Sequence, residues 1–437
     1  MGPFRTNAAL LLMPLYMGCL LLTFPGCHRQ VSPETEQYLQ TLLNRKDYFA
    51  LRKELQLRSD EISKDKLLYL TAFVDNAFNR NAASANKIQQ LLQPDARQLS
   101  DSAKSALLQL EEDNYFKTFQ YALAAAVDSQ LIRSYRHVLD SAGYADIQNT
   151  SLITHGLSSI PAQQITITSD ASFPWKKDKI GLMEIPVRFR DSTWSCIFDT
   201  RANISSISAA YAKKLGVKML GVSYREGSGA TGNSFLTSLG VADSLWLGSV
   251  LLQHVVFQVM PDEILYLAPV DFQLNVIIGY PVIASFREIH VFRNGAMTIP
   301  VHPSGSTLDN LAMDGLDPIV SAIIGSDTLC FQFDTGATST DFYSNYFRKY
   351  KKDILAHGKA NTIRTGGAGG VVQQEVYRLD NMKLTVGSRP ATLPGVDVHV
   401  KPIPGNPENF YGNLGQDLIT QFNEMILNFQ DMYIDFK

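Results

Sequence analysis

The first part of the chain has apolar residues at helical spacing. Over residues 32–142, leucines and aromatic residues recur three and four positions apart, for example within 38–43 and 67–74, which is the period of amphipathic helices. Ser32 followed by Pro33 is a helix start, because serine caps free amides and proline fits the first turn. The pattern predicts an all-helical domain over 32–142. Paired helices of a tetratricopeptide-like solenoid and a plain helical bundle both fit it.

The rest of the chain has a different pattern. Residues 143–174 are polar and irregular, which predicts a linker that includes a first edge strand at 164–168. Further on, apolar and polar residues alternate in short runs, as at 181–189, and this period of two is typical of strands. We expect two β-rich lobes, at 175–302 and 309–437. The predicted fold class is therefore α+β and multidomain, with an all-helical part followed by an all-β part.

The two β-rich lobes share a repeated pattern. Asp199 and Asp334 each follow a short apolar run, each precede a threonine and a predicted helix, and are 135 positions apart. Downstream, an apolar stretch ending in glycine recurs at Gly279 and Gly415, 136 positions apart. A nearly constant offset over such a distance predicts an internal duplication.

The repeat places one carboxylate on a turn at the end of a strand in each copy. Two such turns facing each other would bring Asp199 and Asp334 together. Two close carboxylates cannot both ionise cheaply, so they share one proton, and one becomes an acid while the other becomes a base. An acid and a base of this kind are the groups needed to cleave an amide with an activated water.

The Phe-Asp-Thr-Gly-Ala stretch at 333–337 and its echo Phe-Asp-Thr-Arg-Ala at 198–202 resemble the active-site turn of the aspartic proteases in their retropepsin-like form. The resemblance covers roughly residues 175–437. It implies a bilobal, duplicated acid-protease fold in which each lobe donates one catalytic carboxylate, Asp199 or Asp334.

The resemblance also implies roles for residues around the two aspartates. Turn residues hydrogen-bond across the interface and hold the turns in register, second-loop glycines allow close backbone approach, and glycine-rich flaps close over the substrate. These residues are Thr200, Thr335 and Gly336 in the turns, Gly279 and Gly415 in the second loops, and Gly229, Gly232, Gly367 and Gly369 in the flaps.

Arg201 departs from the pattern, because the family has glycine at this position. If the backbone there needs a positive φ, arginine is strained. If the guanidinium points inward, it favours the ionised form of both carboxylates and weakens acid catalysis. If it points outward, it is free to contact substrate.

These features predict an aspartic endopeptidase that acts on a peptide or protein substrate. Two alternatives stay open. The first is a catalytically impaired, peptide-binding pseudoprotease, because Arg201 replaces the usual glycine. The second is a homodimer that uses only the Asp334 turn of each chain.

The N-terminal segment is predicted to be a targeting signal. Arg5 precedes a mostly apolar run from Ala8 to Leu22, and the stretch that ends at Cys27 resembles a bacterial lipoprotein cleavage site. Residues 1–27 are then a signal peptide, and Cys27 becomes the lipidated N-terminus. We therefore expect a membrane association through a lipid anchor in the bacterial cell envelope, in the periplasm or at the outer membrane.

Composition adds only exclusions. The net charge of −3 gives no argument for a nucleic-acid partner. The eight histidines are scattered, without a His-Glu-x-x-His motif or a Cys/His cluster, so neither a metal nor another cofactor is predicted. The helical domain is a candidate site for a protein partner.

Overall fold

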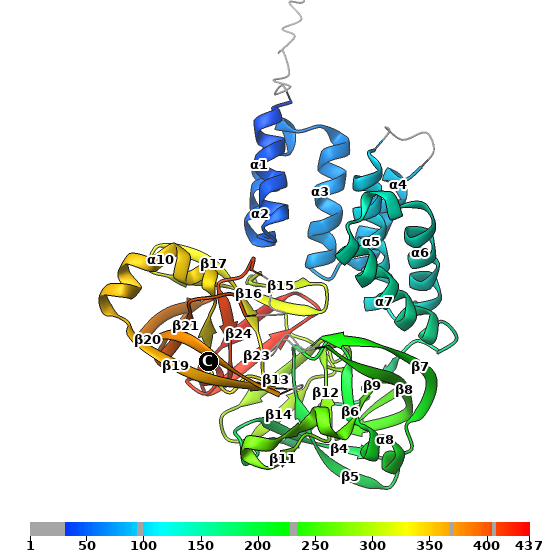
Figure 1. Cartoon of the computed structure of the whole chain (residues 1–437), viewed down its shortest axis with the longest axis vertical. Coiled ribbons are helices and arrows are strands. Elements are labelled where there is room, and N and C mark those ends of the chain that lie inside the picture. The colour runs from blue at the N-terminus through cyan, green and yellow to red at the C-terminus, as the bar shows by residue number, and fades with distance from the viewer. Residues whose placement is uncertain (1–30, 94–98, 228–233, 368–369, 404–407) are drawn as a thin grey trace, which may run out of the picture.

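The computed structural model describes residues 31–93, 99–227, 234–367, 370–403 and 408–437. It has an N-terminal helical region followed by a mostly β region with two large sheets, which confirms the predicted order of helical and β parts (Figure 1). In the described part of the chain, no helix is long and apolar enough to cross a membrane. Cys27 and the rest of the predicted signal peptide lie outside the described residues, so the lipid anchor stays a prediction.

The helical region is built from antiparallel helices that each pack against their neighbours in the chain. Their packing buries an apolar stripe on most helices, as the sequence period requires. The helices are α1 (Pro33–Asn44), α2 (Tyr48–Arg58), α3 (Lys64–Ala77), α4 (Asn81–Leu91), α5 (Asp101–Lys117), α6 (Tyr121–Ser134) and α7 (Ser141–Leu157). The type of helical repeat stays a prediction.

Three helix–helix turns have the same backbone geometry. Lys46, Asn79 and Phe119 follow α1, α3 and α5 with φ values of 56°, 60° and 58°. In each turn the next amide reaches back five residues to a helix carbonyl, as Asp47 does to Leu42 over 3.0 Å. This left-handed cap satisfies the last carbonyls of the helix and reverses the chain sharply. The sequence did not indicate this motif, because glycine is the usual residue at such a cap and none of the three positions is glycine.

The predicted linker over 143–174 is wrong in its first half, where α7 forms a helix. Gly143, Asn149 and Gly156 are poor helix formers, but buried contacts of Ile147 and Leu157 override propensity. Gly156 lies so close to Val222 that a Cβ there would be 2.9 Å from a methyl carbon of that valine. Packing against the β region therefore stabilises this helix.

The β region has one large sheet in each lobe and a smaller sheet between them. The first-lobe sheet contains β1 (Gln164–Thr166), β3 (Lys176–Lys177), β4 (Met183–Phe189), β5 (Ser192–Phe198), β6 (Ser205–Ser208), β7 (Lys218–Gly227), β8 (Ser234–Leu247), β9 (Val250–Met260) and β12 (Val276–Ile278). The second-lobe sheet contains β15 (Leu311–Asp314), β16 (Asp317–Ile324), β17 (Asp327–Phe333), β18 (Asp341–Phe342), β19 (Lys359–Gly367), β20 (Gly370–Val386), β21 (Arg389–His399) and β22 (Gly412–Leu414). The linking sheet contains β2 (Ala171–Pro174), β13 (Glu288–Phe292), β14 (Ala296–Ile299), β23 (Glu424–Asn428) and β24 (Tyr433–Phe436).

Short elements complete the lobes. They are the hairpin of β10 (Tyr266–Leu267) with β11 (Phe272–Gln273), and the helices α8 (Ala209–Leu215), α9 (Tyr280–Ser285), α10 (Ser344–His357) and α11 (Gln416–Ile419). Each lobe contains the same parallel pairing. In the first, β5 pairs with β12 so that Phe198 lies beside Ile278, and in the second, β17 pairs with β22 so that Phe333 lies beside Leu414. This likeness agrees with the predicted duplication, which stays a prediction.

The linking sheet joins the lobes around a buried carboxylate. Strands β13 and β23 are antiparallel, with Glu288 beside Asn428. The Glu288 side chain is 1% exposed and accepts hydrogen bonds from Asn428 Nδ2 at 2.6 Å, Ser304 Oγ at 2.7 Å and Tyr433 Oη at 3.0 Å. Burial alone would raise the pKa of Glu288, but the hydrogen bonds from His290, Ser304 and Asn428 outweigh it and lower this pKa.

The helical region contacts both lobes, through the turns after α1 and α3 and through the side of α7 (Figure 1). Lys46 Nζ lies 2.7 Å from Asp314 Oδ2, at the end of β15. Asn79 Nδ2 donates to the carbonyl of Phe429. On α7, the Asn149 amide group both donates to and accepts from the backbone of Arg225 on β7. The helical region therefore lies against both lobes and covers the edge strand of one predicted flap hairpin.

We expect Glu288→Gln to destabilise the linking sheet, because an amide N–H₂ would then face donors that now bind a carboxylate. The thermal unfolding midpoint at pH 7 should fall by about 5–10 °C, the value expected for about 3 kcal/mol. A carboxylate with a lowered pKa stabilises the fold above its unfolded pKa of about 4.3 and loses that effect as pH falls further. The variant should therefore also be less sensitive to acid below about pH 4.3.

Glu408→Gln is the matched control, since the ion pair of Glu408 with Arg348 is exposed. Equal unfolding midpoints for Glu288→Gln, Glu408→Gln and the wild type would contradict a structural role for Glu288.

Candidate active site

The two Asp-Thr turns meet at the boundary between the lobes and interlock through their threonines. The Thr200 amide donates to Thr335 Oγ1 at 3.0 Å, and the Thr335 amide donates to Thr200 Oγ1 at 3.1 Å. Each hydroxyl also donates across the interface, Thr200 to the Phe333 carbonyl and Thr335 to the Phe198 carbonyl. Both threonines are fully buried, so these four hydrogen bonds form away from water.

Each turn is also held by its own lobe in matching fashion. The Asp199 amide donates to the carbonyl of Ile278, and the Asp334 amide to that of Leu414, both at 3.0 Å. The second-loop glycines are fixed the same way, because the Gly279 and Gly415 amides donate to hydroxyl oxygens of residues 205 and 340 at 3.0 Å. Strand pairing therefore sets the direction of both carboxylates.

The two carboxyl groups have different partners. Asp199 Oδ1 accepts from the amides of Arg201 at 2.8 Å and Ala202 at 3.1 Å. Asp334 Oδ1 accepts from the amide of Gly336 at 2.8 Å, and Asp334 Oδ2 accepts from Asn413 Nδ2 at 3.2 Å. On Asp199, the backbone amides leave Oδ2 as the oxygen that can hold a proton.

The electrostatics favour a proton on Asp199. Burial, followed by the negative charge of Asp334, raises the pKa of Asp199 to about 7. The hydrogen bonds from Arg201 and Ala202 oppose this shift without cancelling it. A carboxyl that stays protonated up to about pH 7 beside a second carboxyl is the arrangement that acid–base cleavage requires.

Arg201 points inward. Its Nη1 lies 3.7 Å from Asp334 Oδ2, and its Nε lies 3.5 Å from Asp317 Oδ1. Burial would lower the pKa of Arg201, but Tyr343 and the two aspartates raise it, so the side chain is charged. Burial also raises the pKa of Asp317, and the positive charge of Arg201 opposes this shift. Asp317 is therefore a second negative partner, beside Asp334, for the positive charge of Arg201.

The strain considered for Arg201 is absent, because it is not among the described residues with positive φ. At the corresponding position of the second turn, Gly336 leaves no room for a side chain, because a Cβ there would lie 2.5 Å from Asp199 Cγ. The second loops are equally tight. A Cβ at Gly279 would lie 2.3 Å from the Ala202 carbonyl oxygen, and one at Gly415 would lie 2.7 Å from the backbone of Ser339.

The predicted flap residues are described only in part. Gly367 lies at the end of β19, where it pairs with Gly370 of β20. Gly229, Gly232 and Gly369 lie outside the described residues. Both predicted flaps are antiparallel hairpins in their described parts, β7 with β8 and β19 with β20. Closure over a substrate stays a prediction.

Sequence reasoning missed two residues of the site. Asn413 is part of the second-loop pattern, but only the strand pairing reveals that its amide binds Asp334. Asp317 lies 17 positions before Asp334 on another strand, and no local motif marks it. The unusual Arg201 was the available signal, because a buried arginine needs an acidic partner.

Comparison with known proteins supports part of this assignment. The family model described as aspartyl protease matches residues 185–282, a stretch that contains Asp199 and Gly279. The resemblance to aspartyl proteases is therefore confirmed at family level for the first lobe. No curated protein matches the chain.

Solved structures that match the chain include plant and bacterial proteins. Basic 7S globulin from soybean has a TM-score of 0.40 and 11% identity, covering 62% of this chain and 95% of its own. Conglutin gamma, a basic 7S globulin from lupine seeds, has a TM-score of 0.39 and 10% identity, covering 61% and 94%. A retropepsin-like aspartic protease from Rickettsia conorii has a TM-score of 0.21 and 12% identity, covering 31% and 92%.

We expect Thr200→Val to destabilise the β region, because it removes one hydroxyl and leaves the Thr335 amide and the Phe333 carbonyl buried without partners. The cost should be about 3 kcal/mol, or about 5–10 °C in the unfolding midpoint. Thr200→Ser keeps the hydroxyl and should lower the midpoint far less. Thermal unfolding followed by near-ultraviolet circular dichroism measures both, and equal midpoints for the two variants would refute the interlock.

Proposed function

We propose that this protein is an aspartic endopeptidase that uses Asp199 and Asp334 of one chain. The observation that supports this most strongly is the interlocked pair of Asp-Thr turns, in which burial raises the pKa of one carboxyl to about 7. The other carboxyl lies beside a guanidinium and an amide N–H₂. The pair is therefore suited to hold a single proton on Asp199 near neutral pH.

In the proposed mechanism, the ionised Asp334 takes a proton from a water molecule that attacks the scissile carbonyl. Protonated Asp199 donates its proton to the carbonyl oxygen, which gives a neutral tetrahedral intermediate. A proton then passes from the pair to the amide nitrogen as the carbon–nitrogen bond breaks. The different hydrogen-bond partners of the two aspartates fix these roles before substrate binds.

A hollow on the second lobe is an argument for a peptide substrate. It has a volume of about 530 Å³ and is lined by Thr362, Val372, Gln373, Gln374, Glu375, His399, Lys401 and Pro402. The Gln374 Oε1 atom is buried without a hydrogen-bond partner among the described residues, so it can accept from a peptide amide. An extended peptide lying along this hairpin would gain affinity from backbone pairing.

Contacts link this hollow to the catalytic pair. His399 Nε2 lies 2.9 Å from Asp341 Oδ2, and Asp341 on β18 is paired with Asn413 on β22. Asn413 in turn donates to Asp334. The strands that form the hollow are therefore connected, through β18, to β22, which helps to position Asp334.

One observation favours a second function, the binding of peptides without cleavage. The Arg201 guanidinium lies inside the site, near Asp334, where it opposes proton sharing between the carboxylates. The dimer that uses only Asp334 is less well supported, because Thr200 of the same chain already occupies the hydrogen-bonding positions of Thr335.

We expect Asp199→Asn and Asp334→Asn each to abolish cleavage of peptides from a random library, because each removes a titrating group. In the wild type, activity should fall about tenfold per pH unit above about pH 7, since Asp199 must be protonated to act as the acid and loses its proton through its raised pKa. A statine-type inhibitor should block the reaction. Unfolding midpoints close to the wild-type value show that the variants are folded.

The pattern of loss separates the three functions. Activity that survives Asp199→Asn would favour the dimer of Asp334 turns. If the wild type cleaves no library peptide but binds peptides in calorimetry, the protein is a binding module.

Arg201→Gly tests the role of the guanidinium only if its partner is also neutralised, because Asp317 would otherwise be left buried and unpaired. We expect the double variant Arg201→Gly with Asp317→Asn to move the alkaline fall of activity to higher pH, since the positive charge of Arg201 opposes the raised pKa of Asp199. Asp317→Asn alone, which keeps the guanidinium beside Asp334, is the control. A uniform gain in rate with an unchanged profile would instead mean that Arg201 blocks the natural site.

A further inference from the structure

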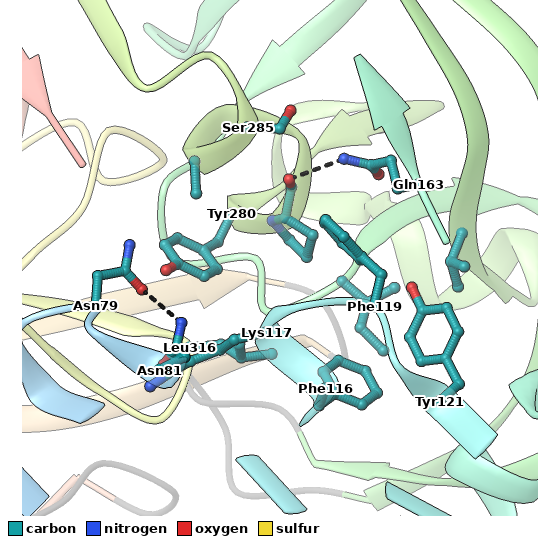
Figure 2. A pocket seen from close by; sticks show the side chains of 14 residues that line it. Asn79, Asn81, Phe116, Lys117, Phe119, Tyr121, Gln163, Tyr280, Ser285 and Leu316 are labelled. Carbon is teal, nitrogen blue, oxygen red and sulfur yellow. Dashed lines mark hydrogen bonds between the residues drawn. The ribbon is translucent and has the colours of Figure 1, made fainter. Parts of the chain in front are cut away.

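A cavity of about 160 Å³ lies where the helical region meets the first lobe and the tip of the β15–β16 hairpin (Figure 2). Its walls come from both the helical region and the β region, so it exists only when the two pack against each other. The residues that line it are Asn79, Asn81, Phe116, Lys117, Phe119, Tyr121, Gln163, Ile204, Val256, Tyr280, Pro281, Ala284, Ser285 and Leu316.

The walls are mainly aromatic and aliphatic. Phe116 and Phe119 each lie edge-on to Tyr121, with ring centroids 5.5 and 6.3 Å apart. Phe119 has a φ of 58°, a conformation that a bulky residue rarely adopts, and this backbone turns its ring toward the cavity (Figure 2). Such walls favour a flat aromatic molecule through edge-to-face contacts.

The polar groups of the cavity leave one acceptor open. Asn79 is engaged on both sides, because it donates to the Phe429 carbonyl and accepts from Asn81 Nδ2. Asn81 Oδ1 is buried and has no hydrogen-bond partner among the described residues. A buried unpaired acceptor costs stability, so a ligand that donates to it gains the net free energy of a hydrogen bond.

The charge of the cavity is balanced. Lys117 is the charged residue among those that line it, and its side chain is 1% exposed. Its Nζ lies 2.6 Å from Asp113 Oδ2 and donates to Asn76 Oδ1 at 3.1 Å. Because the ammonium is already neutralised, a charged ligand would lose its hydration without gaining a new counter-charge.

We propose that this cavity binds a neutral aromatic molecule of one or two rings that carries an N–H or O–H donor, with the donor on Asn81 Oδ1 and the ring among Phe116, Phe119 and Tyr121. The volume suits this size, since a dry cavity of about 150 Å³ holds benzene. The site is separate from the proposed catalytic pair, and its occupation does not depend on whether the protein is a protease.

The cavity lies directly behind the turn that bears Asp199. Tyr280, in its wall, donates its backbone amide to the Ala202 carbonyl at 2.8 Å. Ile204, also in the wall, is two positions further along the same turn. A molecule bound here would therefore contact the residues that hold the Asp199 turn from behind.

Indole and benzofuran are the probes, because they have nearly the same shape and only indole has an N–H donor. Saturation-transfer NMR titrations of the full-length chain should give a dissociation constant of about 0.1–1 mM for indole, as expected for nine heavy atoms. Benzofuran should bind about threefold to tenfold more weakly, which is the net effect of one hydrogen bond.

Variants locate the binding. Ala284→Leu fills the cavity from α9 and should abolish the indole signal, whereas Ala209→Leu on the exposed start of α8 is a matched change outside it and should leave binding intact. Asn81→Leu removes the acceptor at similar size and should bring indole and benzofuran to equal affinity. Unfolding midpoints report whether each variant is folded.

The proposal is overturned if indole does not bind the wild type, or if Ala284→Leu and Ala209→Leu bind it equally. Equal affinity of the wild type for indole and benzofuran would overturn the assignment of Asn81 and with it the proposed class of ligand. Because every readout is binding, failure here is distinct from failure of the peptidase assays.

Discussion

The four hydrogen bonds that Thr200 and Thr335 make across the lobe interface are the constraint on which the site depends. They fix two turns from different lobes against each other in a fully buried interface, where an unpaired amide or carbonyl would be costly. The linking sheet adds a second connection through Glu288 and its ring of donors. Because the lobes are joined at both places, the two carboxyl groups keep their positions without a substrate.

The two aspartates of this site have different charged and polar neighbours. Asp199 accepts hydrogen bonds from backbone amides of its own turn and occupies the space that a Cβ at position 336 would need, whereas Asp334 faces Asn413 and Arg201. A symmetric pair would leave open which carboxyl holds the proton. Here the guanidinium on one side and burial on the other give each aspartate a different environment, and Asp317 compensates part of the charge that Arg201 introduces.

The β15–β16 hairpin connects this charge network to the helical region. Asp317, at one side of its tip, binds Arg201, and Asp314, at the other side, binds Lys46 after α1. Leu316, between them, lines the cavity against the helices. The helical region is thus packed onto elements that contact the Asp-Thr turns, and α7 covers the edge of a predicted flap strand. It is an integrated part of the structure, since its left-handed caps point into the β region.

The sequence by itself determined the order of helical and β parts, the two Asp-Thr turns and the unusual Arg201, because these depend on local periodicity and on motifs repeated at a constant offset. The sequence misjudged α7, where a polar and irregular stretch predicted a linker, since burial against Val222 and Leu131 outweighs helix propensity. Only the tertiary structure decided that Arg201 points inward, that Asp317 and Asn413 belong to the site, and that a cavity forms behind the Asp199 turn. Those contacts join residues far apart in the sequence, and their energies depend on distance and burial, which no local pattern encodes.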